Sequence, residues 1–348
     1  MESYHTYKPR TLLDCSSVLV MRRFGFLLKT YLGDFTETSA LVESFNKHNV
    51  ENLPLDIVVP ESEINIFNIF SSETVTVLSE ELIPSTFTEV PIEGIRPGYI
   101  NQEIVKLSYF RLNRSENYMC LDSDALFIRD IQIEDFIRHD GIPYTVLIED
   151  RELMSDPVYR DEHWLTRESQ LVKIRNYLGV PQGMNLLTCH GFQILQHSVL
   201  SAFEREILDA KQIDFLDLLK ISPYEFSWYN YFLQVSNFPL AIREPYFRVI
   251  HSGTQFAYER LLGQKTTDWS NGYLGLVLNS NFQHLAFKAG YEASPTLVVA
   301  TYLKTSQILR ILFISIGAFT VRALSKPLIF LRRILSGLTS RGSTNLDM

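Results

Sequence analysis

Two acidic residues, two positions apart, offer the clearest chemistry in this sequence. Asp122 and Asp124 follow the short apolar run 118–121, which predicts a buried strand. Alternation along an extended chain would aim both carboxylates the same way. At the carboxyl end of a buried strand they would repel each other unless a cation lies between them or each is separately hydrogen-bonded.

A divalent metal ion that carries a diphosphate would relieve this repulsion. Mg²⁺ and Mn²⁺ prefer oxygen ligands, and one or two carboxylates usually hold them together with phosphate oxygens. The pair therefore indicates metal-assisted transfer from a nucleotide-linked donor. The alternative is that Asp122 caps the next turn while Asp124 is solvated, and the motif alone does not decide between the two.

Composition indicates a folded protein in a reducing environment. The chain has 348 residues, of which 46% are apolar, enough for the core of one large α/β domain or two ordinary ones. Cys15, Cys120 and Cys189 are too scattered for a disulfide framework, and none belongs to a C-x-x-C pair. The polar residues 1–10 lack the apolar core of a cleaved secretion signal, so we expect a cytoplasmic location.

Charge is distributed unevenly along the chain. The net charge is −8, but residues 300–348 carry seven basic residues against Asp347 alone, so this segment is +6 and the remainder −14. An acidic body disfavours nucleic acid as a partner. Within the tail, residues 309–319 are apolar but shorter than the ~20 residues of a spanning helix. The tail is typical of helices on the inner, anionic membrane surface, and packing against the body is the alternative.

The first half of the chain alternates strand-like and helix-like segments, which favours a parallel sheet. The expected elements are a strand at 17–21 or 25–30, a helix at 38–48, a strand at 55–59, a helix at 61–70, a strand at 74–78 and a helix at 101–112. The last helix is apolar around most of its circumference, so Gln102 and Lys106 would point into the protein; a solvated polar face is the alternative.

Three later segments place polar residues near predicted turns or helix starts. His190 lies at a turn within residues 186–195, which otherwise resemble a strand. Glu225 begins an aromatic helix that also contains Trp228 and Tyr229. Residues 247–253 predict a late strand that delivers His251 to a glycine turn, although such a histidine is more often structural.

Taken in this order, these features resemble the GT-A class of nucleotide-sugar-dependent glycosyltransferases, particularly bacterial-type enzymes of polysaccharide and glycolipid assembly. The likeness spans about residues 15–260. It implies one α/β catalytic domain at 15–295, with a mostly parallel, Rossmann-like central sheet flanked by helices. Its nucleotide-binding half would be 15–130 and its acceptor half 131–260. An N-terminal extension at 1–14 precedes this domain, and the basic helical tail at 296–348 follows it.

The resemblance also implies a donor site with Mn²⁺ or Mg²⁺. Asp124 would bind the metal directly, Asp122 would reach the metal or the ribose, and His251 would complete the metal shell as a neutral imidazole. A nucleotide sugar, most simply a UDP-sugar, would be held by Lys29, Thr30, Gln102, Lys106, Asp122 and Ser123.

The acceptor would be a saccharide or a lipid-linked sugar. If configuration inverts, a carboxylate must take the proton of the attacking hydroxyl, and Glu225 is the first choice, with Asp150 and then Glu149 behind it. Glu225 is equally explained as an acid in a first helical turn. His190, Trp228 and Tyr229 would line the acceptor site; the two aromatics are also explained as core residues.

Two other functions remain as alternatives. A phosphatase of the haloacid dehalogenase type also has two aspartates at a strand end, but the threonine expected two residues on is missing. A non-catalytic, membrane-tethered carbohydrate-binding or scaffolding protein with the same fold would need no donor turnover.

Overall fold

A computed structural model describes residues 21–148, 165–183, 186, 192–250, 255–256 and 266–278 of the chain. Contacts divide the chain into two units, Met1–Val249 with Ser270–Val277 and Ile250–Trp269 with Leu278–Met348. Helix α11 (Thr266–Trp269) belongs to the second unit, whereas the central sheet and the helices that cover it belong to the first. The predicted domain boundaries stay predictions, and the tail lies outside the described residues.

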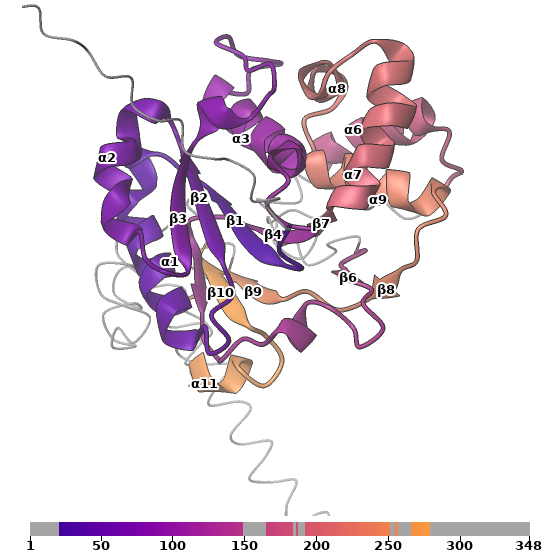
Figure 1. The fold of residues 1–348 in the computed structure, drawn as a ribbon. Coiled ribbons are helices and arrows are strands. Elements are labelled where there is room, and N and C mark those ends of the chain that lie inside the picture. Colours follow the sequence, from indigo (N-terminus) through magenta and orange to yellow (C-terminus); the bar gives the residue numbers. More distant parts are fainter. Residues whose placement is uncertain are drawn as a thin grey trace, which may run out of the picture. The chain divides into compact units, whose positions relative to one another are not determined.

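A five-stranded sheet forms the centre of the first unit, with strand order β3-β2-β1-β4-β7 (Figure 1). Strands β1 to β4 are parallel, and β7 is antiparallel to β4. This confirms the α/β class with a mostly parallel central sheet between helices. The strands are β1 (Gly25–Lys29), β2 (Leu55–Val59), β3 (Val75–Ser79), β4 (Asn117–Leu121) and β7 (Ile194–Gln196).

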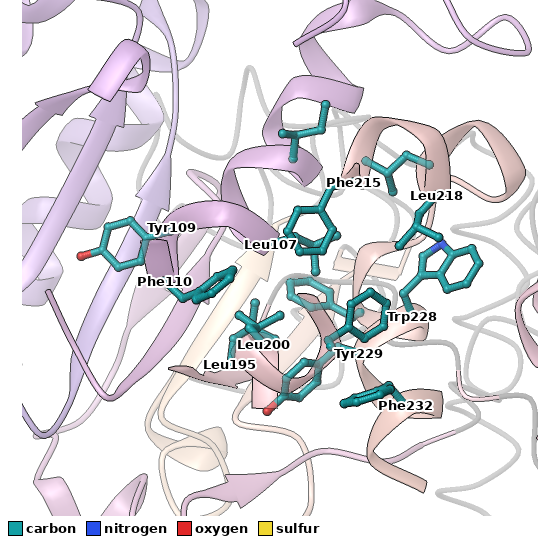
Figure 2. Packing of buried hydrophobic residues seen from close by; sticks show 14 of the residues in the cluster. Leu107, Tyr109, Phe110, Leu195, Leu200, Phe215, Leu218, Trp228, Tyr229 and Phe232 are labelled. Carbon is teal, nitrogen blue, oxygen red and sulfur yellow. The ribbon is translucent and has the colours of Figure 1, made fainter. Parts of the chain in front are cut away.

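Alternate residues of these strands face two separate hydrophobic clusters. Leu27 and Cys120 belong to a cluster with α3, α6, α7, α8 and α9, which Figure 2 shows in part. Phe26 and Leu28 belong to a second cluster with α1 and α2. Both faces of the central strands are therefore buried, as expected for a parallel sheet. The helices are α1 (Phe35–His48), α2 (Ile64–Phe67), α3 (Pro97–Ser108), α6 (Leu165–Leu178), α7 (His197–Phe203), α8 (Phe215–Ile221) and α9 (Glu225–Val235).

Short elements complete the described first unit. Strands β5 (Ala125–Phe127), β10 (Gly275–Leu278) and β9 (Phe247–Ile250) form a second sheet, and β6 (Tyr144–Thr145) pairs with β8 (Ala241–Ile242). The helix expected at 61–70 is interrupted: one turn of α-helix, α2, lies between two 3₁₀ turns, Glu61–Glu63 and Asn68–Phe70. A π-helical turn, Glu204–Asp209, extends α7.

Strand order creates a topological switch point between β1 and β4. The chain passes from β1 outward through β2 to β3, then returns to place β4 on the other side of β1. In the register, Leu28 of β1 is paired with Leu121 of β4, so both strands end at the same edge. Ligands of open α/β sheets bind outside the carboxyl ends of strands at such a point.

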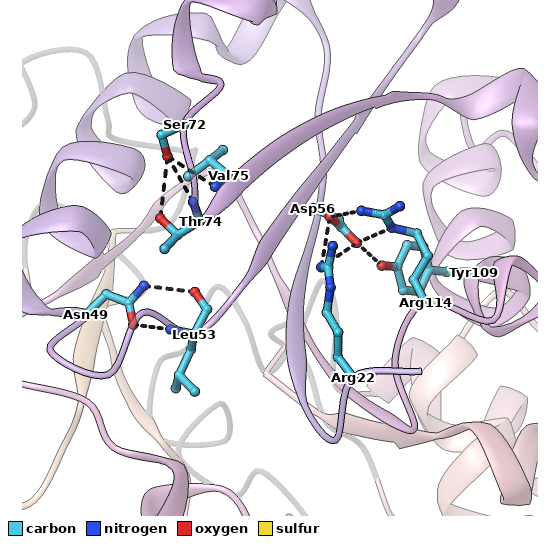
Figure 3. Close-up of polar contacts among 9 residues, drawn as sticks. All are labelled: Arg22, Asn49, Leu53, Asp56, Ser72, Thr74, Val75, Tyr109 and Arg114. Atoms are coloured by element: carbon cyan, nitrogen blue, oxygen red, sulfur yellow. Dashed lines mark hydrogen bonds and ion pairs between the residues drawn. The ribbon is translucent and has the colours of Figure 1, made fainter. Parts of the chain in front are cut away.

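At the opposite edge of the sheet, the carboxylate of Asp56, near the start of β2, contacts side chains from other segments of the chain (Figure 3). Arg114 donates to both of its carboxylate oxygens, at 2.6 and 2.8 Å, and Arg22 lies 3.4 Å away. The hydroxyl of Tyr109 donates to the same carboxylate. Asp56 is 1% exposed, so these partners replace the water that its charge has lost.

No helix among the described residues is long and apolar enough to cross a membrane.

Candidate functional site at the carboxyl edge of the sheet

The first two side chains at this edge are Lys29, which ends β1, and Thr30, which follows it, and both make contacts within the protein. Lys29 is buried, and its Nζ lies 2.7 Å from Glu80 Oε2 and donates to the carbonyl of Thr30. The hydroxyls of Thr30 and Thr38 share a hydrogen bond of 2.9 Å. The predicted contact of Lys29 and Thr30 with a nucleotide stays a prediction.

Asp122, Ser123 and Asp124 leave β4 in a tight turn rather than as extended chain. The backbone N–H of Ala125 donates to the carbonyl of Asp122 at 3.1 Å, and β5 begins at once on the second sheet. The chain is therefore not extended through these residues, so strand alternation is not what sets the directions of the two carboxylates. The turn still keeps them close enough for the charge of Asp122 to act on Asp124.

One carboxylate oxygen of the half-buried Asp124 lacks a hydrogen-bond partner among the described residues. This oxygen, Oδ1, is itself buried. Burial raises the pKa of Asp124 well above its usual range, and the charges of Asp122 and Asp34 add to the effect. The pKa of Asp34 is itself raised by burial, although Ser123 Oγ donates to its Oδ2 at 3.2 Å.

A buried lysine on α3 connects this turn to α9. Nζ of Lys106 lies 3.1 Å from Asp122 Oδ1, 3.1 Å from Glu225 Oε1 and 3.8 Å from Glu103 Oε1. Gln102 also donates to Asp122 Oδ1, at 3.2 Å. The structure thus brings together four of the predicted site residues. The prediction that Lys106 points into the protein is confirmed, whereas Gln102 is half-buried and contacts Asp122.

Protonation within this cluster is uneven. Burial, with a contribution from the charge of Asp122, raises the pKa of Glu103 to about 8, although Lys106 acts in the opposite direction. Glu103 Oε2 has no hydrogen-bond partner among the described residues, which suits a neutral carboxyl group. Burial also works against the ammonium of Lys106, but Asp122 and Glu103 outweigh it and raise the pKa of Lys106. These shifts favour the ammonium form of Lys106 and the neutral form of Glu103.

Trp228 and Tyr229 lie in the hydrophobic core (Figure 2). Both are 0% exposed; the indole donates to the carbonyl of Ser222, and the Tyr229 hydroxyl accepts from the N–H of Gln196. Neither ring presents a face to a sugar in this structure. Their acceptor role stays a prediction.

Four predicted site residues fall outside the described part of the chain: Glu149, Asp150, His190 and His251. Within the described part, no group of three or more His, Cys, Asp or Glu side chains is arranged to hold a metal ion. The donor set there consists of the Asp122 and Asp124 carboxylates, and the unpartnered oxygen of Asp124 fits a hard cation such as Mg²⁺ or Mn²⁺.

Two acids near this edge were not among the predicted site residues. Glu103 lies on α3 beside Gln102 and one turn before Lys106, and these two neighbours were the available signal. Asp34 precedes α1 and reads in the sequence as an ordinary residue before a helix. Only the pairing of β1 with β4 brings it to Ser123.

Comparison with known proteins places the chain in context. Residues 19–277 match the model described as "Family of unknown function (DUF6492)". No curated protein matches the sequence. Mouse xyloside xylosyltransferase 1 is similar in structure at 11% identity and a TM-score of 0.40, with 74% of this chain and 98% of that chain covered. The bifunctional glycosyltransferase WbbM is similar at 11% identity and a TM-score of 0.43, with 83% and 51% covered. Likenesses this distant do not define an activity.

Proposed function

The chain belongs to the DUF6492 family, and for this member we propose metal-dependent transfer of a sugar from a nucleotide-sugar donor to a saccharide or glycolipid acceptor. Support comes from the likeness of its ordered motifs to GT-A glycosyltransferases and from the place of those motifs in the fold. A UDP-sugar is the donor that we would test first.

One observation carries the proposal. The Asp122–Asp124 turn leaves β4 at the switch point beside the end of β1, and it contains a buried carboxylate oxygen without a partner among the described residues. The pKa of Asp124 is raised because the effects of its burial and of the Asp122 and Asp34 charges exceed those of a backbone hydrogen bond and of the Lys106 charge, which act in the opposite direction. A divalent ion would favour the ionised carboxylate, and the edge of the sheet is where a nucleotide would bind.

Asp124 and Asp122 are the residues that we propose as metal ligands, with His251 as a third. When bound, Mn²⁺ or Mg²⁺ would stabilise the negative charge of the departing nucleoside diphosphate. Asp122 has its Oδ1 engaged by Lys106 and Gln102, so these two residues fix its orientation. Orientation by neighbouring donors is a common feature of carboxylates that bind metals.

Glu225 is our proposed base for an inverting reaction. Its Oε1 accepts from the ammonium of Lys106 at 3.1 Å. An adjacent positive charge favours the ionised carboxylate, which is the form that can take a proton from an acceptor hydroxyl. Its place in the first turn of α9 favours the same ionised form. Asp150 is the second candidate for this role.

A donor screen tests the proposal. Purified full-length protein is incubated with a panel of nucleotide sugars and Mn²⁺, and release of the nucleoside diphosphate is measured with and without candidate acceptors. We expect release from one nucleotide class, lost on chelation. Protein that releases no nucleoside diphosphate from any donor, with or without metal, would contradict the proposal.

A further inference from the structure

Nζ of Lys106 lies within 4 Å of three acidic side chains, two of which come from other parts of the chain. Glu103 lies one turn away on α3, Asp122 follows β4, and Glu225 begins α9. The contacts to Asp122 and Glu225 are equal at 3.1 Å, whereas that to Glu103 is 3.8 Å. The ammonium is therefore shared mainly between a proposed metal ligand and the proposed base.

Most of this cluster is buried, which strengthens the interactions of the shared ammonium. The side chains of Lys106, Glu103 and Glu225 are 4%, 2% and 7% exposed, whereas that of Asp122 is 25% exposed. Charges removed from water interact more strongly than at a surface, and water cannot replace a partner that leaves. Because Asp122 is the more exposed of the two main partners, a second cation reaches it more readily than it reaches Glu225.

We propose that Lys106 is a resident counter-ion that competes with the divalent cation for Asp122. When the cation binds Asp122, the ammonium pairs more closely with Glu225. Lys106 thus couples the cation site to the proposed base across two elements of the fold. This inference rests on the proposed function, because that function supplies the cation, and it gives Lys106 a role other than direct contact with the donor phosphates.

The test measures Mn²⁺ binding alone, by the loss of the free-ion EPR signal, in the full-length protein without donor. The variant is Lys106→Met with Glu225→Gln, which removes one positive and one negative charge and leaves the net charge of the cluster unchanged. Replacement of a buried ion pair by neutral residues is often tolerated, and a thermal melt checks folding. The matched control is Lys173→Met with Glu93→Gln, at an exposed pair 3.8 Å apart.

We expect the Lys106/Glu225 double variant to bind Mn²⁺ at least about fivefold more tightly than the wild type, within the usual range of coupling between sites. The control should bind as the wild type does. Unchanged or weaker Mn²⁺ binding by the double variant would overturn the inference, and so would an absence of binding in both the variant and the wild type. Weaker binding of a nucleoside diphosphate with unchanged Mn²⁺ binding would instead assign Lys106 to the donor phosphates.

The donor screen separates this inference from the proposed function. Tighter Mn²⁺ binding by the double variant, in a protein that turns over no nucleotide sugar, would support the counter-ion and reject the glycosyltransferase. Donor turnover by the wild type, with Mn²⁺ affinity unaffected by the double substitution, would support the glycosyltransferase and reject the counter-ion role of Lys106.

Discussion

Nζ of Lys106 lies 3.1 Å from Oε1 of Glu225, in a buried ion pair that joins α3 to α9. The same ammonium lies 3.1 Å from Asp122. Asp122, the proposed metal ligand, and Glu225, the proposed base, therefore both contact the ammonium of Lys106. Any substitution in this cluster should change both metal binding and proton transfer.

Asn at position 124 should stabilise the metal-free protein. The pKa of Asp124 is raised, so its ionisation costs folding free energy at any pH above the usual carboxyl range. Asp124→Asn removes that cost, and we expect the Tm in EDTA at pH 7.5 to rise by about 2–4 °C. The exposed Asp209→Asn is the matched control and should leave the Tm unchanged. A lower Tm for Asp124→Asn would contradict this prediction, because it would show that contacts within the protein already stabilise the charge of the Asp124 carboxylate.

Glu103 should make stability fall as the pH rises. Its pKa is raised from 4.5 to about 8 in the folded protein, so the folded state binds more protons between these values. The resulting contribution to stability is complete below about 4.5 and is lost as the pH approaches 8. Relative to that of Glu103→Gln, the free energy of unfolding of the wild type should decline by on the order of 1 kcal/mol per pH unit over this range. Urea unfolding at pH 5.5 to 8.5 measures this, and parallel profiles for the two proteins would refute it.

Asp56 should matter for stability but not for the reaction. Asp56→Ala leaves two arginines beside a buried site, and loss of one partner of a buried ion pair costs about 3–5 kcal/mol. Urea unfolding gives this value, and Asp140→Asn, in an exposed pair with Arg138, is the control that should change little. Because Asp56 lies at the edge of the sheet opposite the site, the KM for the donor should stay the same in protein that remains folded. A changed KM in a sample that is fully folded would show that Asp56 contributes to the site.

The sequence predicted the central strands well and the turn between the aspartates poorly. Strands such as β2 are short apolar runs between turn residues, and both of its ends agree with expectation. The sequence left a turn at Asp122 only as an alternative to extended chain, because apolar residues resume at Ala125. The change from one sheet to another at Ala125 is visible only in the tertiary structure. Asp56 and Glu103 look like surface acids in the sequence. Their burial depends on arginine and lysine partners that only tertiary structure brings near.

The basic tail should mediate membrane contact. It carries a net charge of +6 on alternating apolar and basic residues, so removal of residues 300–348 should release the protein from vesicles that contain anionic lipid. High salt should weaken binding of the full-length chain in the same assay. Co-sedimentation measures both effects, and vesicles without anionic lipid are the control. Equal sedimentation of the truncated and full-length proteins would reject membrane contact by the tail.

Release of nucleoside diphosphate from a nucleotide sugar, compared between the wild type and Asp124→Asn with and without Mn²⁺, tests the central claim most directly. The account predicts Mn²⁺-dependent release by the wild type, release by Asp209→Asn at the same rate, and at least a hundredfold loss in Asp124→Asn, on the order of one strong transition-state interaction. Undiminished release by Asp124→Asn, or release that does not depend on the metal, would contradict it.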